Sequence, residues 1–103
     1  GGGRIMAIIG DTIRLKAKFY TWTGVVADPE NIKLRIFNSY RKQLGEDIQI
    51  GHEHRVEAGT YQYEYTSTGQ EGSILFFEFS GTLEGMPTTN RGKVPIEWIK
   101  PSK

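Results

Sequence analysis

Short runs of alternating apolar and polar residues, each closed by Gly, Pro, Asn or Asp, fill nearly all of this chain of 103 residues. The clearest run is 12–20, where apolar residues alternate with Arg14, Lys16 and Lys18. A period of two places successive side chains on opposite faces, so this pattern predicts a half-buried β-strand. Six further strand-like runs lie at 5–9, 32–38, 47–56, 60–66, 73–83 and 93–100.

No stretch has apolar residues at the positions i, i+3, i+4 and i+7 that an amphipathic helix requires. Strands about ten residues apart, with turn residues between them, are typical of an all-β sandwich or barrel. We therefore predict one sandwich domain over 6–100, with about seven antiparallel strands in two sheets. Residues 1–5, which open on three glycines, are interpreted as a cloning remnant and N-terminal tail, and 101–103 as a C-terminal tail.

Breaks within the runs indicate where some strands lie. Gly51 and two histidines interrupt the run at 47–56, which favours an edge strand, either whole or split in two. Pro95 lacks a backbone donor, so the last run is also expected at a sheet edge. We predict the first, second and fifth runs in one sheet and the third, sixth and seventh in the other. Residues 84–92, rich in Gly, Pro, Thr and Asn, are interpreted as a loop.

Three tyrosines, Tyr61, Tyr63 and Tyr65, share one face of their run. Exposed aromatic side chains could stack on sugars or bases. Tyrosines at a period of two more often lie in a core with their hydroxyls at its rim, and we expect this for at least two of the three. The predicted core comprises Ile13, Leu15, Phe19, Leu34, Ile36, Tyr63, Leu75, Phe77, Val94 and Ile96.

The order of these features resembles a known plan. Gly10-Asp11-Thr12 opens a strand, Asp28-Pro29 precedes another, and Gly59-Thr60-Tyr61 begins a third. This order, closed by a strand that ends near Trp98, resembles immunoglobulin-like or fibronectin-III-like domains of bacterial surface proteins, macroglobulin-type repeats and small phage proteins. The resemblance spans roughly 5–100 and implies an immunoglobulin-like sandwich with a structural or adhesive role. The cysteine pair of antibody domains is absent, because the chain has no cysteine.

Composition narrows the partner class. A net charge of +1 argues against a dedicated nucleic-acid binder. The longest apolar run, Ile5–Ile9, is too short for a transmembrane helix, so no membrane partner is expected. We therefore expect a protein partner, such as a virion or surface-assembly protein. The sequence does not determine the oligomeric state. If Met6 is the native start of a phage protein, the location is the virion or host cytoplasm; a fragment of a longer surface protein would be extracellular.

Candidate metal and catalytic residues are few. On a strand, His52 and His54 would share a face, an arrangement that suits two zinc ligands, but no third ligand is evident. Asp11, Asp28 and Asp47 fall at strand ends, yet no loop has the density of carboxylates that calcium requires. We interpret these aspartates as turn residues that bond their own backbone. No nucleophile, base and carboxylate occur in a catalytic pattern. We therefore predict that the protein is not an enzyme and that it binds no metal and no cofactor.

Basic residues also have a structural interpretation. Arg14, Lys16 and Lys18 lie on one run and Lys33 and Arg35 on another. In an immunoglobulin-like plan these runs belong to opposite sheets, so their basic stripes point away from each other. Cross-strand pairing with Glu64 and Glu78 is expected to neutralise part of this charge.

The sequence predicts that the protein is a non-enzymatic structural or protein-binding module, associated with a phage or prophage virion. The alternative is a carbohydrate-binding or adhesive module of a larger bacterial surface protein, which would need two or three exposed aromatic residues on one face. Loops 21–31 and 82–92 are long for hairpins, and long loops often carry function. The binding residues predicted on them are Trp22, Thr23, Met86 and Arg91.

Overall fold

The computed structural model describes residues 7–8 and 12–97. Within these residues the chain forms eight strands and one short 3-10 helix, η1. They are β1 (Ala7–Ile8), β2 (Thr12–Lys18), β3 (Glu30–Phe37), β4 (Ile48–Ile50), η1 (His52–His54), β5 (Arg55–Glu57), β6 (Thr60–Thr66), β7 (Ile74–Leu83) and β8 (Met86–Glu97).

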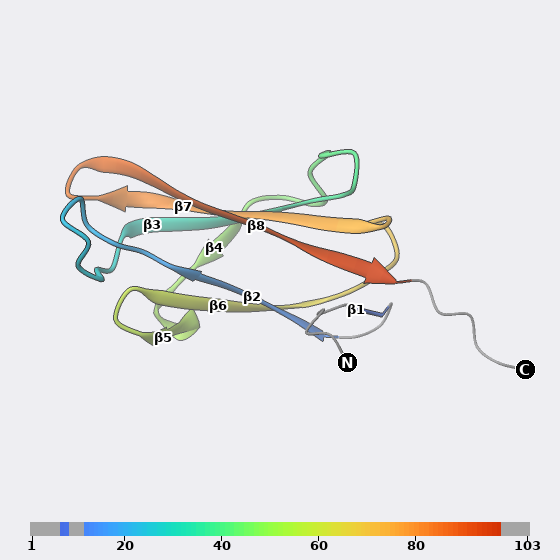
Figure 1. Ribbon diagram of the computed structural model, residues 1–103, viewed down its shortest axis with the longest axis horizontal. Helices are drawn as coiled ribbons and strands as arrows, with labels where there is room; N and C mark the ends of the chain where they lie inside the picture. Colours follow the sequence, from blue (N-terminus) through green and yellow to red (C-terminus); the bar gives the residue numbers. More distant parts are fainter. Residues whose placement is uncertain (1–6, 9–11, 98–103) are drawn as a thin grey trace, which may run out of the picture.

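The strands pack as two sheets in separate layers (Figure 1). One sheet has the order β2-β6-β5 and the other the order β1-β8-β7-β3-β4. All pairings are antiparallel except that of β1 with β8. The layer of β2, β5 and β6 thus faces the layer of β3, β4, β7 and β8, which makes an all-β sandwich. The predicted fold class is confirmed.

One strand lies in the sheet opposite to its predicted place. β1 pairs in parallel with the end of β8, with Ala7 opposite Ile96, so the prediction that the first run joins the sheet of β2 was wrong. Local alternation cannot distinguish the two sheets for a strand of two residues, because both offer a free edge near the chain start. The described residues do not include 5–6 and 9 of the first predicted run, or 98–100 of the last.

The irregular run at 47–56 was predicted as an edge strand, either whole or split in two, and in the structure it is split. β4 is an edge strand of one sheet and β5 an edge strand of the other. Between them the chain crosses through Gly51 and η1, where the backbone N–H of His54 donates to the carbonyl of Gly51 at 3.0 Å. The irregularity in the sequence therefore marks the place where the chain changes sheets.

The predicted loop at 84–92 is a long hairpin instead. Leu83 at the end of β7 pairs directly with Met86 at the start of β8. The two turn residues, Glu84 and Gly85, have φ values of 53° and 77°, the pattern of a type I′ turn. Gly, Pro and Thr in this segment suggested a loop. Pro87 is tolerated because β1 pairs with β8 only at Ile96 and Glu97, which leaves the first part of β8 at a sheet edge.

Apolar side chains from both sheets meet in one core. Of the predicted set, Tyr63, Phe77 and Val94 are only half-buried. Phe77 lies opposite Gly92, which has no side chain to cover the ring, and Val94 lies on β8 ahead of the two residues that pair with β1. The last run was predicted at a sheet edge, but β8 lies between β1 and β7, and β1 pairs with Ile96 and Glu97. Tyr63 lies beyond the short stretch of β6 that pairs with β5. The buried set is Ile13, Leu15, Ala17, Phe19, Ile32, Leu34, Ile36, Ile50, Tyr61, Leu75, Phe79, Leu83 and Ile96.

Gly59 joins the turn before β6 to the loop between β2 and β3. Its carbonyl accepts a hydrogen bond from the backbone N–H of Phe19 at 2.8 Å. Its own N–H donates to Asp28 Oδ1 at 2.7 Å, and the same carboxylate accepts from Arg55 Nε at 3.1 Å. Gly59 has φ of 71°, and an added Cβ would lie 2.9 Å from the carbonyl oxygen of Phe19. A side chain at this position is therefore excluded by both conformation and contact.

We predict that Gly59→Ala destabilises the domain far more than Gly45→Ala. Both glycines have positive φ, but a Cβ at Gly45 would meet nothing within 4 Å. Gly45→Ala should cost only the left-handed conformation, about 1–2 kcal/mol, whereas Gly59→Ala adds a backbone clash and should cost roughly 3 kcal/mol or more. Urea unfolding of the two variants measures the difference, and equal losses would contradict the close contact at Gly59.

Candidate functional site

Two loops meet at one end of the sandwich, on the left of Figure 1. They are the loop between β2 and β3 and the turn between β7 and β8. A hollow of about 580 Å³ lies between them, which we call the tip site. Its lining residues are Tyr20, Thr21, Trp22, Leu83, Glu84, Met86, Pro87 and Thr88.

Backbone hydrogen bonds hold Trp22 at the apex of an ordered turn. The N–H of Thr21 donates to the carbonyl of Val25 at 2.7 Å, and the N–H of Gly24 donates to the carbonyl of Thr21 at 2.9 Å. The hydroxyls of Thr21 and Thr23 lie 3.1 Å apart, and Gly24 supplies the positive φ that closes the turn. The backbone of the turn that carries Trp22 is thus ordered, and 97% of the Trp22 surface is exposed to solvent.

The tip site is apolar and almost uncharged. Tyr20 and Val25 expose 52% and 60% of their surfaces, and Met86 exposes 67%. Residues 19–27 and 85–90 contain no charged side chain, and Glu84 is the only charged residue that lines the hollow. Scattered exposed apolar residues are ordinary, but a contiguous group of them is typical of an interaction surface.

The structure brings together only some of the predicted binding residues. Trp22 and Met86 line the same hollow, and Thr23 is exposed in the Trp22 turn, where its hydroxyl faces Thr21. Arg91 is not in a loop: it lies on β8, and its Nε donates to Glu78 at 2.8 Å on the outer face of the larger sheet. The predictions of loop positions for Met86 and Arg91 were wrong, because β8 already begins at Met86.

The sequence analysis missed other residues at the tip site. Tyr20 and Pro87 line the hollow, and Val25 is exposed beside it in the same turn. The available signal was the absence of charge from the segments 19–27 and 85–90 in a chain that is otherwise rich in charged residues. Two uncharged segments containing aromatic and apolar residues would have indicated both loops together.

The histidine cluster does not form the strand geometry expected of it. His52 and His54 lie in η1, so their side chains do not share a strand face. Nδ1 of His54 accepts a hydrogen bond from the N–H of Gly51 at 3.1 Å, and its ring packs 5.6 Å from that of Tyr63. Across 7–8 and 12–97, no group of three or more His, Asp or Glu side chains is arranged to hold a metal ion.

Asp28 and Asp47 bind arginine rather than their own turns, so that interpretation was wrong. Asp47 accepts from Arg35 Nε and Nη2 at 3.0 and 3.1 Å, and from Gln43 at 2.8 Å. Hydrogen bonds from Arg35 and then Gln43 lower the pKa of Asp47, whereas that of Asp28 is lowered first by the N–H of Gly59 and then by Arg55. Asp11 lies outside the described residues.

The basic stripes lie on opposite sheets, as predicted, because β2 and β3 belong to different sheets. Arg14 lies 3.5 Å from Glu64, and Arg35 lies 3.4 Å from Glu78. Both predicted cross-strand pairs are therefore present.

Glu71 is a fully buried carboxylate, with none of its surface exposed. It accepts hydrogen bonds from the hydroxyls of Tyr65 and Ser67 and from the N–H groups of Thr68 and Gly69. Burial alone raises the pKa of Glu71, but these donors outweigh it and lower the pKa to about 2. A carboxylate this acidic and this fully bonded is poorly suited to proton transfer near neutral pH.

The tyrosine stripe belongs largely to the interior, as predicted. Tyr61 is buried, and Tyr63 and Tyr65 are half-buried against the core. Burial, and then the hydrogen bond to Glu71, raise the pKa of Tyr65 to about 12. The stripe is therefore not an exposed stacking platform.

Comparison of the chain with models of protein families, with curated proteins and with solved structures finds no match. Within the described part of the chain, no helix has the length and apolar character needed to cross a membrane.

We predict that Glu71 contributes to acid sensitivity. Its folded pKa of about 2 lies below the ordinary value of 4.5, so its stabilisation is fully present above pH 4.5 and is lost as the pH falls toward 2. The full contribution is about 3 kcal/mol. Glu71→Gln should be less stable at neutral pH and lose less stability between pH 4.5 and 2, as measured by urea unfolding. Glu46→Gln, a change at an exposed carboxylate, controls for net charge; an unaltered acid profile of Glu71→Gln would contradict this role.

Proposed function

We propose that this protein is a non-enzymatic binding module that holds a partner protein at the tip site. The observation that carries the proposal is the almost complete exposure of Trp22 on a hydrogen-bonded turn beside Met86. Burial of a tryptophan by a partner is among the most favourable single contributions to protein association. Because the turn is already ordered, little conformational entropy is lost when Trp22 is buried.

The low charge of the tip site favours an apolar partner surface. Glu84 is the only charged lining residue, so affinity there depends mainly on removal of apolar surface from water. Such binding is insensitive to salt compared with binding through exposed charges. A virion or surface-assembly protein, which must stay bound in varied surroundings, is a partner of suitable chemistry.

Carbohydrate binding is a second candidate because two aromatic side chains, Tyr20 and Trp22, are exposed within the same hollow. Sugars commonly stack on such rings. Met86 and Val25 add apolar surface that a sugar would use less well than a protein would. We therefore place the protein partner first and make the sugar an outcome of the test.

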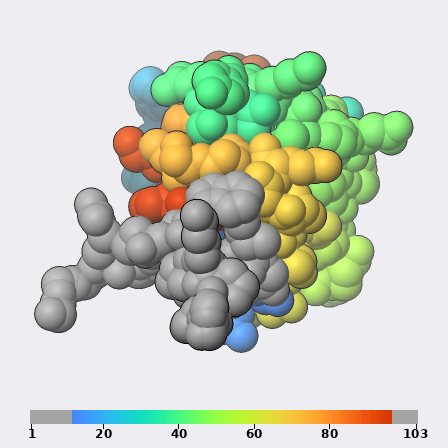
Figure 2. Space-filling model, turned by 90° about the vertical axis from the view of Figure 1, so that its right-hand side faces the viewer, coloured from blue at the N-terminus to red at the C-terminus, as the bar shows by residue number. Residues whose placement is uncertain are grey.

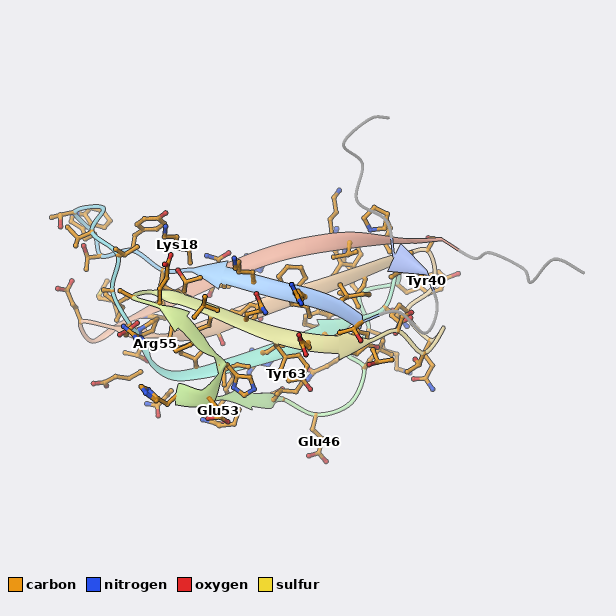
Figure 3. The ribbon with its side chains drawn as sticks, turned by 90° about the horizontal axis from the view of Figure 1, so that it is seen from below. Lys18, Tyr40, Glu46, Glu53, Arg55 and Tyr63 are labelled. Carbon is orange, nitrogen blue, oxygen red and sulfur yellow. The ribbon has the colours of Figure 1, made fainter. Side chains whose placement is uncertain are left out.

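We predict that Trp22→Ser weakens partner binding about thirtyfold, the effect of losing roughly 2 kcal/mol, while thermal stability stays unchanged because the side chain contacts little of the core. Met86→Ser should weaken binding in the same direction. The matched control is Tyr40→Ser, since Tyr40 is 89% exposed and lies at the end opposite to Lys18 and the Trp22 loop (Figure 3).

The measurement is capture from a lysate of the source organism by the immobilised wild-type protein and each variant, followed by quantitative mass spectrometry, with a glycan array in parallel. Proteins lost with Trp22→Ser but kept with Tyr40→Ser support the proposal. Trp22-dependent binding to glycans alone would replace it with the carbohydrate candidate. Capture that is the same for wild type and Trp22→Ser would refute both.

A further inference from the structure

A second hollow lies on the outer face of the five-stranded sheet. Since Leu75 and Phe79 of β7 are buried in the core, Phe76 between them points to the opposite face. Phe37 of β3 pairs with Phe76 in the register of the sheet. Together with parts of neighbouring residues they line a hollow of about 200 Å³, which we call the face groove. Its other lining residues are Arg41, Phe77, Glu78, Arg91 and Gly92.

Arg41 is held over the groove by a turn that would suit glycine or asparagine better. Its φ is 66°, in the left-handed region that few residues other than Gly and Asn adopt easily. The side chain of Asn38 fixes the turn by accepting from the N–H groups of Tyr40 and Lys42 at 2.9 and 3.0 Å. The guanidinium carbon of Arg41 lies 4.7 Å from the ring centroid of Phe76. Figure 2 shows this loop, in green, lying against the segment that leads into β7.

A row of alternating charges borders the groove. Arg35 lies between Asp47 at 3.0 Å and Glu78 at 3.4 Å, and Arg91 lies 2.8 Å from Glu78 on its other side. This row contains two positive and two negative groups and is therefore neutral. Arg91 nevertheless remains largely exposed, with its side chain 75% accessible.

Two further cations, Arg41 in the lining of the groove and Lys93 beside it, give this face a positive surplus. Arg41 covers Phe76, and Lys93 pairs with Phe76 in the register of β7 and β8. Neither forms an ion pair with a carboxylate in the part of the chain that the structure describes. The rings of Phe37 and Phe76, which we call the aromatic floor, lie beside cations that no carboxylate of the described residues neutralises. This combination complements a ligand that carries negative charge beside an apolar group.

We propose that the face groove binds an acidic side chain on an extended segment of a partner protein. The carboxylate lies between Arg41 and Arg91, and an adjacent apolar side chain packs on Phe37 and Phe76. The groove is smaller than the 300–1,000 Å³ of typical small-molecule pockets, so it suits one or two side chains rather than a whole ligand. This site is separate from the tip site and does not depend on it.

The test uses a fluorescein-labelled random copolymer of glutamate and tyrosine, titrated with the full chain and followed by fluorescence anisotropy. Arg41→Asn should weaken binding roughly tenfold, the effect of losing one charge-assisted hydrogen bond. Asparagine tolerates the left-handed turn, so thermal stability should be equal to or above that of the wild type. Lys42→Gln removes the same charge one residue away, outside the groove, and should change affinity less than about twofold.

Each outcome decides the proposal. A selective effect of Arg41→Asn, with Trp22→Ser binding the copolymer as the wild type does, supports it and separates it from the tip site. Equal weakening by Arg41→Asn and Lys42→Gln would mean general charge attraction and overturn it. Polyglutamate binding as tightly as the copolymer would overturn the role of the aromatic floor. Phosphatidylserine vesicles or heparin binding in an Arg41-dependent way, without copolymer binding, would overturn a peptide ligand.

Discussion

The contact of Asp28 with Gly59 is the constraint on which the tip site depends. Asp28 precedes β3 in one sheet, and Gly59 precedes β6 in the other, so this carboxylate and the backbone of Gly59 tie the two sheets together. The same Gly59 carbonyl accepts from Phe19, the first residue after β2. The chain can therefore leave β2, form the Trp22 turn and enter β3 with both ends of the loop fixed. An exposed tryptophan on a loose loop would lose far more entropy when a partner buries it.

At the other end of the sandwich a second carboxylate, that of Glu71, also holds irregular chain in place by hydrogen bonds. Glu71 binds the N–H groups of the turn between β6 and β7, and its own carbonyl accepts from the N–H of Ser39 at 2.8 Å. Ser39 belongs to the loop that carries Arg41, so the buried carboxylate fixes the turn against which that loop rests. Each binding surface that we propose thus lies next to a carboxylate whose pKa is lowered by hydrogen bonds, first from the N–H of Gly59 for Asp28, and from the Tyr65 hydroxyl and then backbone N–H groups for Glu71. In both places irregular chain is made rigid by hydrogen bonds to charge rather than by a larger core.

The sequence predicted the fold better than the sites, for a physical reason. Period-two alternation depends only on neighbouring residues, so the buried face of β2 and the irregular edge segment at 47–56 could be predicted locally. The partners of Asp28 could not, because Gly59 and Arg55 are 31 and 27 residues away. The type I′ turn was missed because it contains Glu84 rather than Asn or Asp before Gly85. Trp22 and Met86 were chosen as separate loop residues, and only the fold shows that they line one hollow.

The two proposed surfaces differ in the physics of binding. The tip site offers exposed apolar surface with one charged residue, so its contribution grows with the area that a partner removes from water. The face groove offers aromatic rings beneath cations, and its attraction for an acidic segment decreases as salt screens exposed charges. One partner could engage both only if it carried an apolar region and an acidic segment at a matching distance along the sandwich. Simultaneous engagement would then raise affinity through effective concentration, without any new contact.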